Sequence, residues 1–123
     1  MSIPTQTFRS CENKGFQMFF ENKWGVSVQF GPGNYCDRRD FGDYTSNPRP
    51  GIWESATAEV AVFKPDGELL RVGNDTVMGW LRTNLVGQII SVVCSLAGDA
   101  DPRIVTDRIE GLVTVDSFRK SGA

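Results

Sequence analysis

Histidine is absent from this chain of 123 residues. The commonest general base at neutral pH and a common zinc ligand are therefore missing, which excludes Ser-His-Asp triads, Cys-His dyads and HExxH zinc sites. An excess of positive charge is missing too, because 13 Lys and Arg stand against 15 Asp and Glu, a net charge of −2. Long nucleic acids attract basic surfaces, so we do not expect one as a main partner.

Long hydrophobic runs are also missing. No apolar segment approaches the roughly 20 residues of a membrane-spanning helix, and residues 1–7 lack the apolar stretch of a signal peptide. The only cysteines, Cys11, Cys36 and Cys94, are odd in number and widely spaced, so they form neither a CxxC pair nor a zinc ribbon. We therefore expect a cytoplasmic protein with reduced thiols, no membrane partner and no metal or other cofactor.

What the sequence does contain is alternating hydrophobicity. Residues 16–20 and 24–30 alternate apolar and polar side chains around the polar turn Glu21–Lys23, which predicts a β-hairpin. Residues 58–63 and 68–72 flank the turn Lys64–Gly67 and predict a second hairpin.

Helical patterns follow the second hairpin. Asn74 or Asp75 is expected to cap a helical turn over residues 77–81, and Thr83 or Asn84 to cap a longer helix that stops at Gly98. In the tail, residues 112–115 are a candidate fifth strand, and residues 117–123 are polar enough to fray.

The predicted fold class is α+β: a small antiparallel sheet of two β-hairpins packed against a C-terminal helical segment. The length and the 40% hydrophobic composition indicate one domain. Within it we expect an N-terminal segment (1–14), a β-β-loop-β-β-α core (15–97) and a C-terminal extension (98–123). Residues 37–51 are predicted to form the long loop at one end of the sheet, and loops of about 15 residues are often functional.

The stretch Ser27–Cys36 and the residues near it are the most distinctive part of the chain. Two glycines after a strand can expose backbone N–H groups to an anion, and two following arginines can add charge; the alternative is that the glycines only shape a turn. The candidate ligand- or partner-binding residues are Gln29, Gly31, Gly33, Asn34, Tyr35, Arg38, Arg39, Trp53 and Glu54.

The three tryptophans divide between core and site. Trp24 lies on an apolar strand face and Trp80 in an apparently helical pattern, so we predict that both belong to the core. Trp53 directly follows the long loop, beside Glu54, where a partly exposed indole can stack on a ligand.

Several carboxylates and one thiol are candidate catalytic groups. Asp37, Asp40 and Asp43 lack the spacing of a calcium loop and are expected to be solvated. Cys36 lies near two arginines but has no histidine partner. A small hydrolase using Cys36, or Glu54 with Glu59, therefore remains the enzymatic alternative.

Five segments of the chain belong together as a set: Gly15-Phe16, Phe20–Asn22, the VSVQFGxGNYC element of Val26–Cys36, Ala58–Val62 and Asp75–Trp80. In these segments the chain resembles a group of small uncharacterised proteins of bacteriophages and prophages. The resemblance covers about residues 15–97, departs from the group at Lys23-Trp24, where a glycine-containing turn is expected, and leaves the tail after Gly98 as an addition. It implies no catalytic residue.

The resemblance implies a small phage accessory protein that acts by occupancy inside the bacterial host. We therefore expect a non-enzymatic counter-defence protein that either sequesters a small nucleotide-like signal or inhibits a host protein. A homodimer is compatible with either role. A virion or assembly component is a further alternative.

Overall fold

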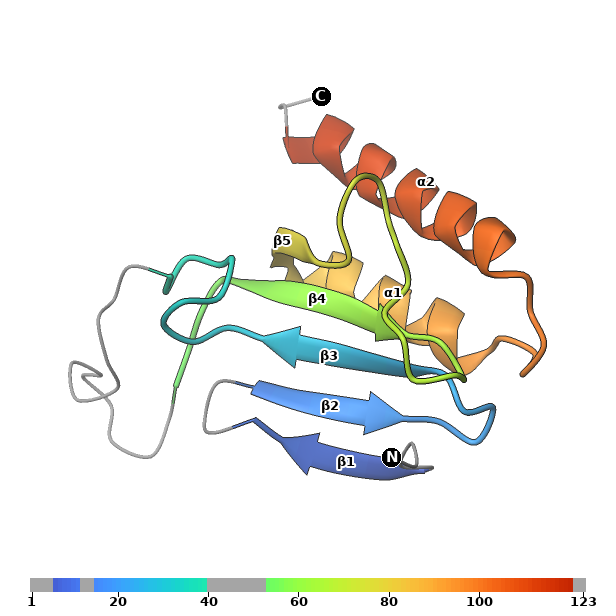
Figure 1. Cartoon of the computed structure of the whole chain (residues 1–123). Helices are drawn as coiled ribbons and strands as arrows, with labels where there is room; N and C mark the ends of the chain where they lie inside the picture. The colour runs from blue at the N-terminus through green and yellow to red at the C-terminus, as the bar shows by residue number, and fades with distance from the viewer. Residues whose placement is uncertain (1–5, 12–14, 40–52, 121–123) are drawn as a thin grey trace.

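The protein is an open antiparallel sheet backed by two helices (Figure 1). The computed structural model describes residues 6–11, 15–39 and 53–120, without the side chains of residues 118–120. The five strands follow one another in the order β1-β2-β3-β4-β5, which confirms the predicted α+β class. The elements are β1 (Thr7–Ser10), β2 (Gly15–Phe19), β3 (Gly25–Gln29), β4 (Thr57–Phe63), β5 (Met78–Arg82), α1 (Thr83–Cys94) and α2 (Pro102–Lys120).

The first predicted hairpin is confirmed as β2 and β3. Phe16 pairs with Val28 and Met18 with Val26, so the apolar residues of both strands lie on one face of the sheet. The turn between the strands includes Lys23 at φ +74°, in the left-handed region where a glycine is unstrained.

The second predicted hairpin exists only in part. The turn at Lys64–Gly67 forms, but the return segment contributes one isolated bridge, between Phe63 and Leu69. The extended partner of β4 is instead β5. The prediction of a helical turn over residues 77–81 is therefore wrong, because pairing with β4 buries Met78 and Leu81 in the core.

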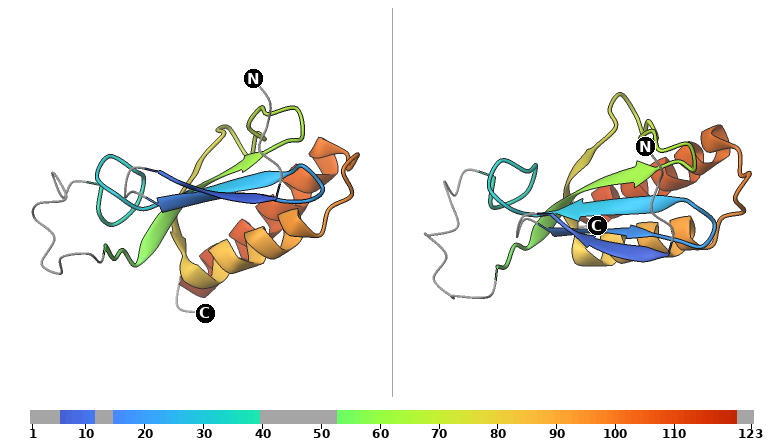
Figure 2. Two further views of the ribbon diagram at one scale, coloured as in Figure 1. Left: turned by 90° about the horizontal axis from the view of Figure 1, so that it is seen from below. Right: turned by 60° about the horizontal axis from the view of Figure 1, so that its bottom comes forward.

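The predicted helix after residue 82 is confirmed as α1, which ends at Cys94, four residues short of Gly98. It covers β3, β4 and β5 on one face of the sheet, and α2 packs beside it (Figure 2). Its buried side chains are Leu85, Val86, Ile89, Val92 and Val93.

The tail after Gly98 was predicted wrongly. Residues 102–120 form α2 in place of a strand at 112–115, and Val105 and Ile109 are fully buried in the common core. Asp101 caps this helix by accepting the N–H of Arg103, and proline suits the first helical position. The tail is therefore part of the packed structure.

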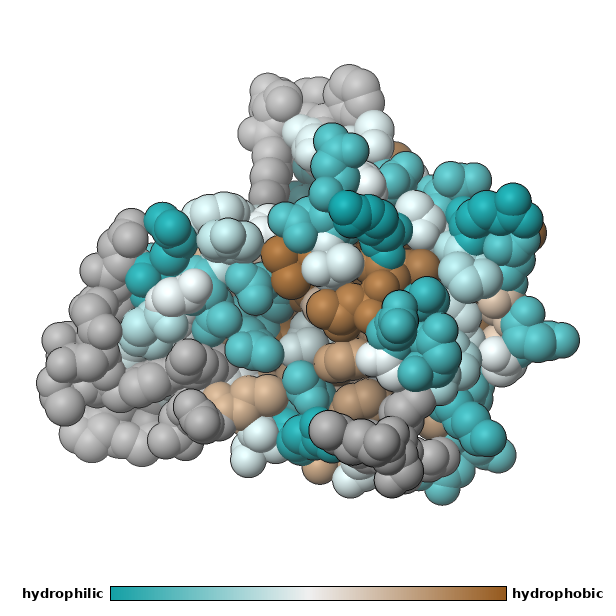
Figure 3. Space-filling model, viewed as in Figure 1, coloured by the Kyte–Doolittle hydropathy of each residue, from teal (hydrophilic) through white to brown (hydrophobic). Residues whose placement is uncertain are grey.

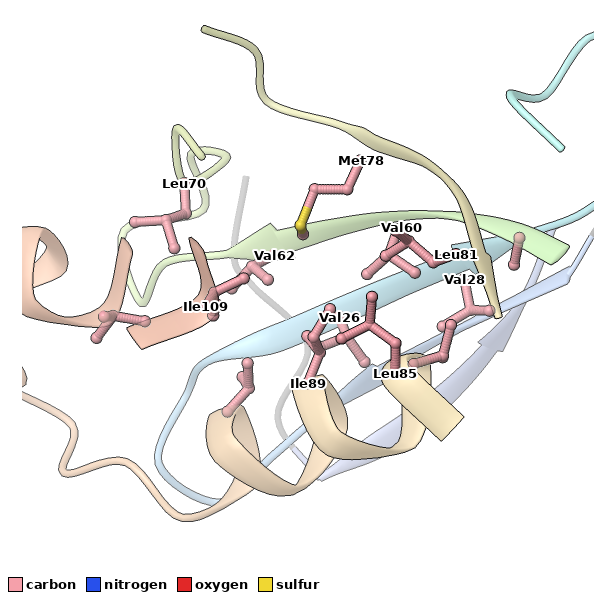
Figure 4. Packing of buried hydrophobic residues seen from close by; sticks show 14 of the residues in the cluster. Val26, Val28, Val60, Val62, Leu70, Met78, Leu81, Leu85, Ile89 and Ile109 are labelled. Carbon is pink, nitrogen blue, oxygen red and sulfur yellow. The ribbon is translucent and has the colours of Figure 1, made fainter. Parts of the chain in front are cut away.

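The hydrophobic core lies between the sheet and the helices (Figure 4). Valines of β3 and β4 meet leucines and isoleucines of α1 and α2, and Trp24 is completely buried, as predicted. Neither helix of the described residues covers the opposite face of the sheet. On it, hydrophobic residues gather over β4 and the connection to β5, with hydrophilic residues around them (Figure 3).

Candidate binding site at the loop end of the sheet

All nine predicted site residues lie at one end of the sheet, where β3 ends, β4 begins and β5 passes into α1 (Figure 1). We call this region, residues 29–39, 53–59 and 79–83, the loop end. The part of the predicted long loop that spans residues 40–51, including Asp40 and Asp43, lies outside the described residues. The described residues of the site fall into three groups.

The first group shapes the loop that follows β3. The Gly31 N–H donates to Asn34 Oδ1 (3.0 Å), and the Gly33 N–H donates to the Arg39 carbonyl (3.0 Å). Asn34 also donates from Nδ2 to Gln29 Oε1 (3.3 Å) and is buried. Both glycine amides are thus engaged inside the loop, in place of the anion-facing arrangement that the sequence suggested.

The second group is an exposed aromatic stack. The rings of Tyr35 and Trp80 lie 5.6 Å apart between centroids and 15° from parallel, and the Arg39 guanidinium lies 5.6 Å from the Tyr35 ring. Tyr35 is 39% exposed and Trp80 is 45% exposed. We call Tyr35, Trp80 and Arg39 the aromatic platform.

The platform is held by the backbone on both sides. The Tyr35 N–H donates to Glu59 Oε2 (2.9 Å), and the Trp80 N–H donates to the Tyr35 carbonyl (2.8 Å). Gly79 permits this close approach, since a Cβ there would lie 2.7 Å from Tyr35 Cβ. The position of the rings is therefore fixed by main-chain contacts as well as by stacking.

A β-bulge in β5 presents Trp80. Ala58 pairs with Leu81 and Val60 with Met78, so β5 has one more residue than β4 across this stretch. Trp80 has φ +54°, a left-handed conformation that costs a bulky residue about 1–3 kcal/mol. The prediction that Trp80 belongs to the core is wrong. A glycine before an aromatic residue in a strand is the signal that could have revealed the bulge.

The third group lies around Trp53. The Arg38 Nε–H donates to the Glu54 carbonyl (2.7 Å), and its guanidinium lies 5.7 Å from the Trp53 ring. The Trp53 indole N–H donates to the Phe30 carbonyl (2.8 Å). Trp53 is half-buried and borders a hollow on the α1 side. The two neighbouring arginines therefore contact different groups, Arg38 at Trp53 and Arg39 at Tyr35.

The candidate catalytic groups are placed as follows. Cys36 is 1% exposed, and its Sγ lies 3.7 Å from the Gly31 carbonyl, so a substrate cannot reach the thiol in this conformation. Asp37 accepts a hydrogen bond from the Thr57 hydroxyl (2.9 Å), and Glu59 accepts one from the Tyr35 N–H. Within residues 6–11, 15–39 and 53–120, no three acidic or cysteine side chains gather as metal ligands.

No protein family model matches the chain, and no curated protein or solved structure shows a significant similarity to it. Among the helices that the structure describes, none is long and apolar enough to cross a membrane.

Proposed function

We propose that this chain is a non-enzymatic binding protein that holds a partner protein through the aromatic platform. The observation that carries the proposal is the exposed stack of Tyr35 on Trp80 with Arg39 against it. Trp, Tyr and Arg are the residues most enriched among the energetic hot spots of protein interfaces. Two large rings at 39% and 45% exposure offer apolar surface that a partner can bury.

The rigidity of the platform supports the same function. A side chain that is already fixed loses little conformational entropy on binding. Main-chain hydrogen bonds to Tyr35 and Trp80 fix both residues, and Trp80 retains a strained backbone. Backbone strain of this kind is concentrated at functional sites, since elsewhere an unstrained residue would give a more stable fold.

A partner protein fits the site better than a nucleotide does. The amides of Gly31 and Gly33 are engaged inside the loop, and Arg38 Nε is bonded to the Glu54 carbonyl. The carboxylate of Glu59 lies at Tyr35 and repels a phosphate brought to the stack. A phosphate at the platform would therefore meet the Arg39 guanidinium without the two glycine amides that the sequence suggested.

The geometry also defines the partner's contact. Trp80 and Tyr35 suit an aliphatic, prolyl or aromatic side chain, and Arg39 suits a carboxylate beside it. In the phage setting that the sequence resemblance implies, the partner is a protein of the bacterial host, and binding blocks that protein's action in defence.

The experiment compares the wild-type chain with Trp80→Ala and, as a matched control, Ile104→Ala. Ile104 is a 66% exposed apolar residue of α2 outside the loop end. Each purified protein is used to capture partners from host lysate, and the affinity of the captured protein is then measured by calorimetry. We expect the wild type and Ile104→Ala to bind alike and Trp80→Ala to bind at least about 30-fold more weakly.

Two results would contradict the proposal. One is a partner that Trp80→Ala binds as tightly as the wild type does. The other is tight binding of a member of a nucleotide panel that Trp80→Ala loses, which would assign the platform to a nucleotide-like signal. Circular dichroism of each variant checks that it is folded.

A further inference from the structure

A hollow on the α1 side of the loop end is separate from the aromatic platform. It has a volume of about 510 Å³ and lies between the start of β2, the end of β3, the start of β4 and residues 83–90 of α1. Small-molecule sites usually measure about 300–1,000 Å³ and are mostly apolar. The size and position of this hollow therefore suit a small ligand.

The walls of the hollow are aromatic and aliphatic. Phe16 and Phe30 come from the sheet, Trp53 from the segment before β4, and Val86 from α1. The Trp53 indole is fixed by its hydrogen bond to the Phe30 carbonyl, and the Arg38 guanidinium covers its ring. Three aromatic rings around one space favour a flat, aromatic occupant over a flexible alkyl chain.

Gly87 borders the hollow from the middle of α1, and packing does not require a glycine there. A Cβ built on Gly87 meets no atom within 4 Å. Glycine in a helix interior is unfavourable relative to alanine. Gly87 therefore leaves this wall of the hollow without a side chain, and a large residue placed there would fill the space.

Polar groups at the rim restrict the ligand further. Glu54 is the ionisable side chain among the described lining residues, and the Arg38 guanidinium lies 5.7 Å from the Trp53 ring that borders the hollow. Charges of both signs at the rim favour neither an anionic nor a cationic ligand. Thr83 adds a hydroxyl at the start of α1, where it can donate to or accept from a ligand. An uncharged ring with one hydrogen-bonding group satisfies both.

We infer that this hollow binds a small, uncharged ligand whose body is a planar aromatic ring system carrying one hydrogen-bonding group. The ring lies between Phe16, Phe30 and Trp53, and its polar group meets Thr83. The site does not depend on the platform, since it uses Arg38 and Trp53 in place of Arg39, Tyr35 and Trp80.

The test titrates 2-naphthol, an uncharged two-ring compound with one hydroxyl, into the wild-type chain and three variants. Gly87→Phe and Ala56→Trp add bulk from the α1 wall and from the segment before β4. Gly111→Phe is the matched control, because Gly111 lies within α2, does not border the hollow and also has open space at its Cβ. Binding is followed by 2-naphthol fluorescence and by the nuclear magnetic resonance signal of the Trp53 indole N–H.

We expect saturable binding by the wild type that shifts the Trp53 signal. Affinity should fall at least tenfold in Gly87→Phe and in Ala56→Trp, and it should stay within twofold in Gly111→Phe. Gly87→Ala is expected to fold and to bind 2-naphthol, which separates filling of the hollow from damage to α1. Absence of saturable binding by the wild type, or equal affinity in all folded variants, would overturn the inference.

Discussion

The two ends of the sheet differ in how completely the chain satisfies its own polar groups. At the end opposite the loop end, which we call the turn end, Asn22 donates from Nδ2 to the carbonyls of Val93 (2.9 Å) and Leu96 (2.8 Å). Its Oδ1 accepts the Trp24 N–H, and the Trp24 indole N–H donates to the Ala97 carbonyl (3.2 Å). The turn between β2 and β3 thus holds the last turn of α1.

At the loop end, fewer of the polar groups are satisfied by the chain itself. There α1 begins after Arg82 without a hydrogen bond from a capping side chain, although Asp101 caps α2 near the turn end. Positive φ values occur at both ends, but Lys23 lies in a turn, whereas Trp80 lies inside a strand. The exposed rings and the hollow are also at the loop end.

This contrast shows how a small chain can carry features that lower its stability. Exposed rings, an open hollow and a strained residue each lower the stability of the fold. They are tolerated where contacts elsewhere hold the sheet and helices together, and here those contacts are at the turn end.

The largest expected effect breaks the turn end. Asn22→Ala removes the donor to the carbonyls of Val93 and Leu96 and the acceptor for the Trp24 N–H, so it should lower the free energy of unfolding by about 2 kcal/mol. Urea denaturation measures the change. Asn84→Ala is the matched control on exposed α1 surface, and it should change stability by less than about 0.5 kcal/mol. Equal losses in both variants would remove the special role of Asn22.

The next effect concerns the strain at Trp80. Trp80→Ala loses the stack on Tyr35 and keeps a Cβ on a left-handed backbone, so the strain remains. Trp80→Gly loses the stack and relieves the strain. We therefore expect the Gly variant to be more stable than the Ala variant by about 1 kcal/mol, the reverse of the usual order in a strand. Thermal and urea unfolding of the pair decide it. An Ala variant as stable as the Gly variant would mean that position 80 is unstrained.

A smaller effect sharpens the comparison at α1. Gly87→Ala should raise the free energy of unfolding by about 0.5–1 kcal/mol, because alanine favours the helix and its Cβ meets no atom within 4 Å. The gain would show that the loop end carries a residue that does not maximise stability. Urea denaturation beside Gly111→Ala measures it, and a loss of stability would indicate crowding around Gly87.

The smallest effect concerns pH at the start of α2. The pKa of the Asp101 carboxyl lies below its ordinary value, chiefly because the Arg103 side chain donates a hydrogen bond to it and also because the Arg103 N–H donates another. A depressed folded-state pKa stabilises the protein above the unfolded-state pKa, and that contribution disappears as pH falls through the folded-state value. Asp101→Asn should therefore be slightly less stable than the wild type at pH 7. The difference in unfolding midpoint should vanish in strong acid; a difference that widens there would contradict the sign.

Much of the fold could be predicted from local periodicity. Residues 16–20 and 24–30 alternate on either side of a short polar turn, and α1 has apolar residues at spacings of three and four, so their structures follow from adjacent residues. β5 could not be predicted in that way, because its partner β4 lies far back in the chain and its bulge breaks the alternation. In α2, the run Leu112–Val115 is typical of strands, and burial of Val105 and Ile109 against distant residues favours the helix along its length.

The site was predictable in position more than in detail. Residues at the ends of β3 and β4 meet because antiparallel neighbours place them at one edge, which brought all nine candidates together. That Arg38 turns to Trp53 and Arg39 to Tyr35 depends on side-chain contacts that no sequence spacing encodes. Trp80 is expected in the core because its segment, residues 77–81, follows a possible helix cap and has a helical pattern. In that segment Met78 and Leu81 are three residues apart.

That spacing has a consequence for how the protein can evolve. In a regular strand, residues three apart point to opposite faces, and only the extra residue of the bulge lets Met78 and Leu81 both enter the core. The same extra residue removes position 80 from the alternation, so the packing of Met78 and Leu81 does not depend on which side chain stands there. Substitutions at this one position can therefore change the exposed surface of the loop end and leave the packing of the core as it is.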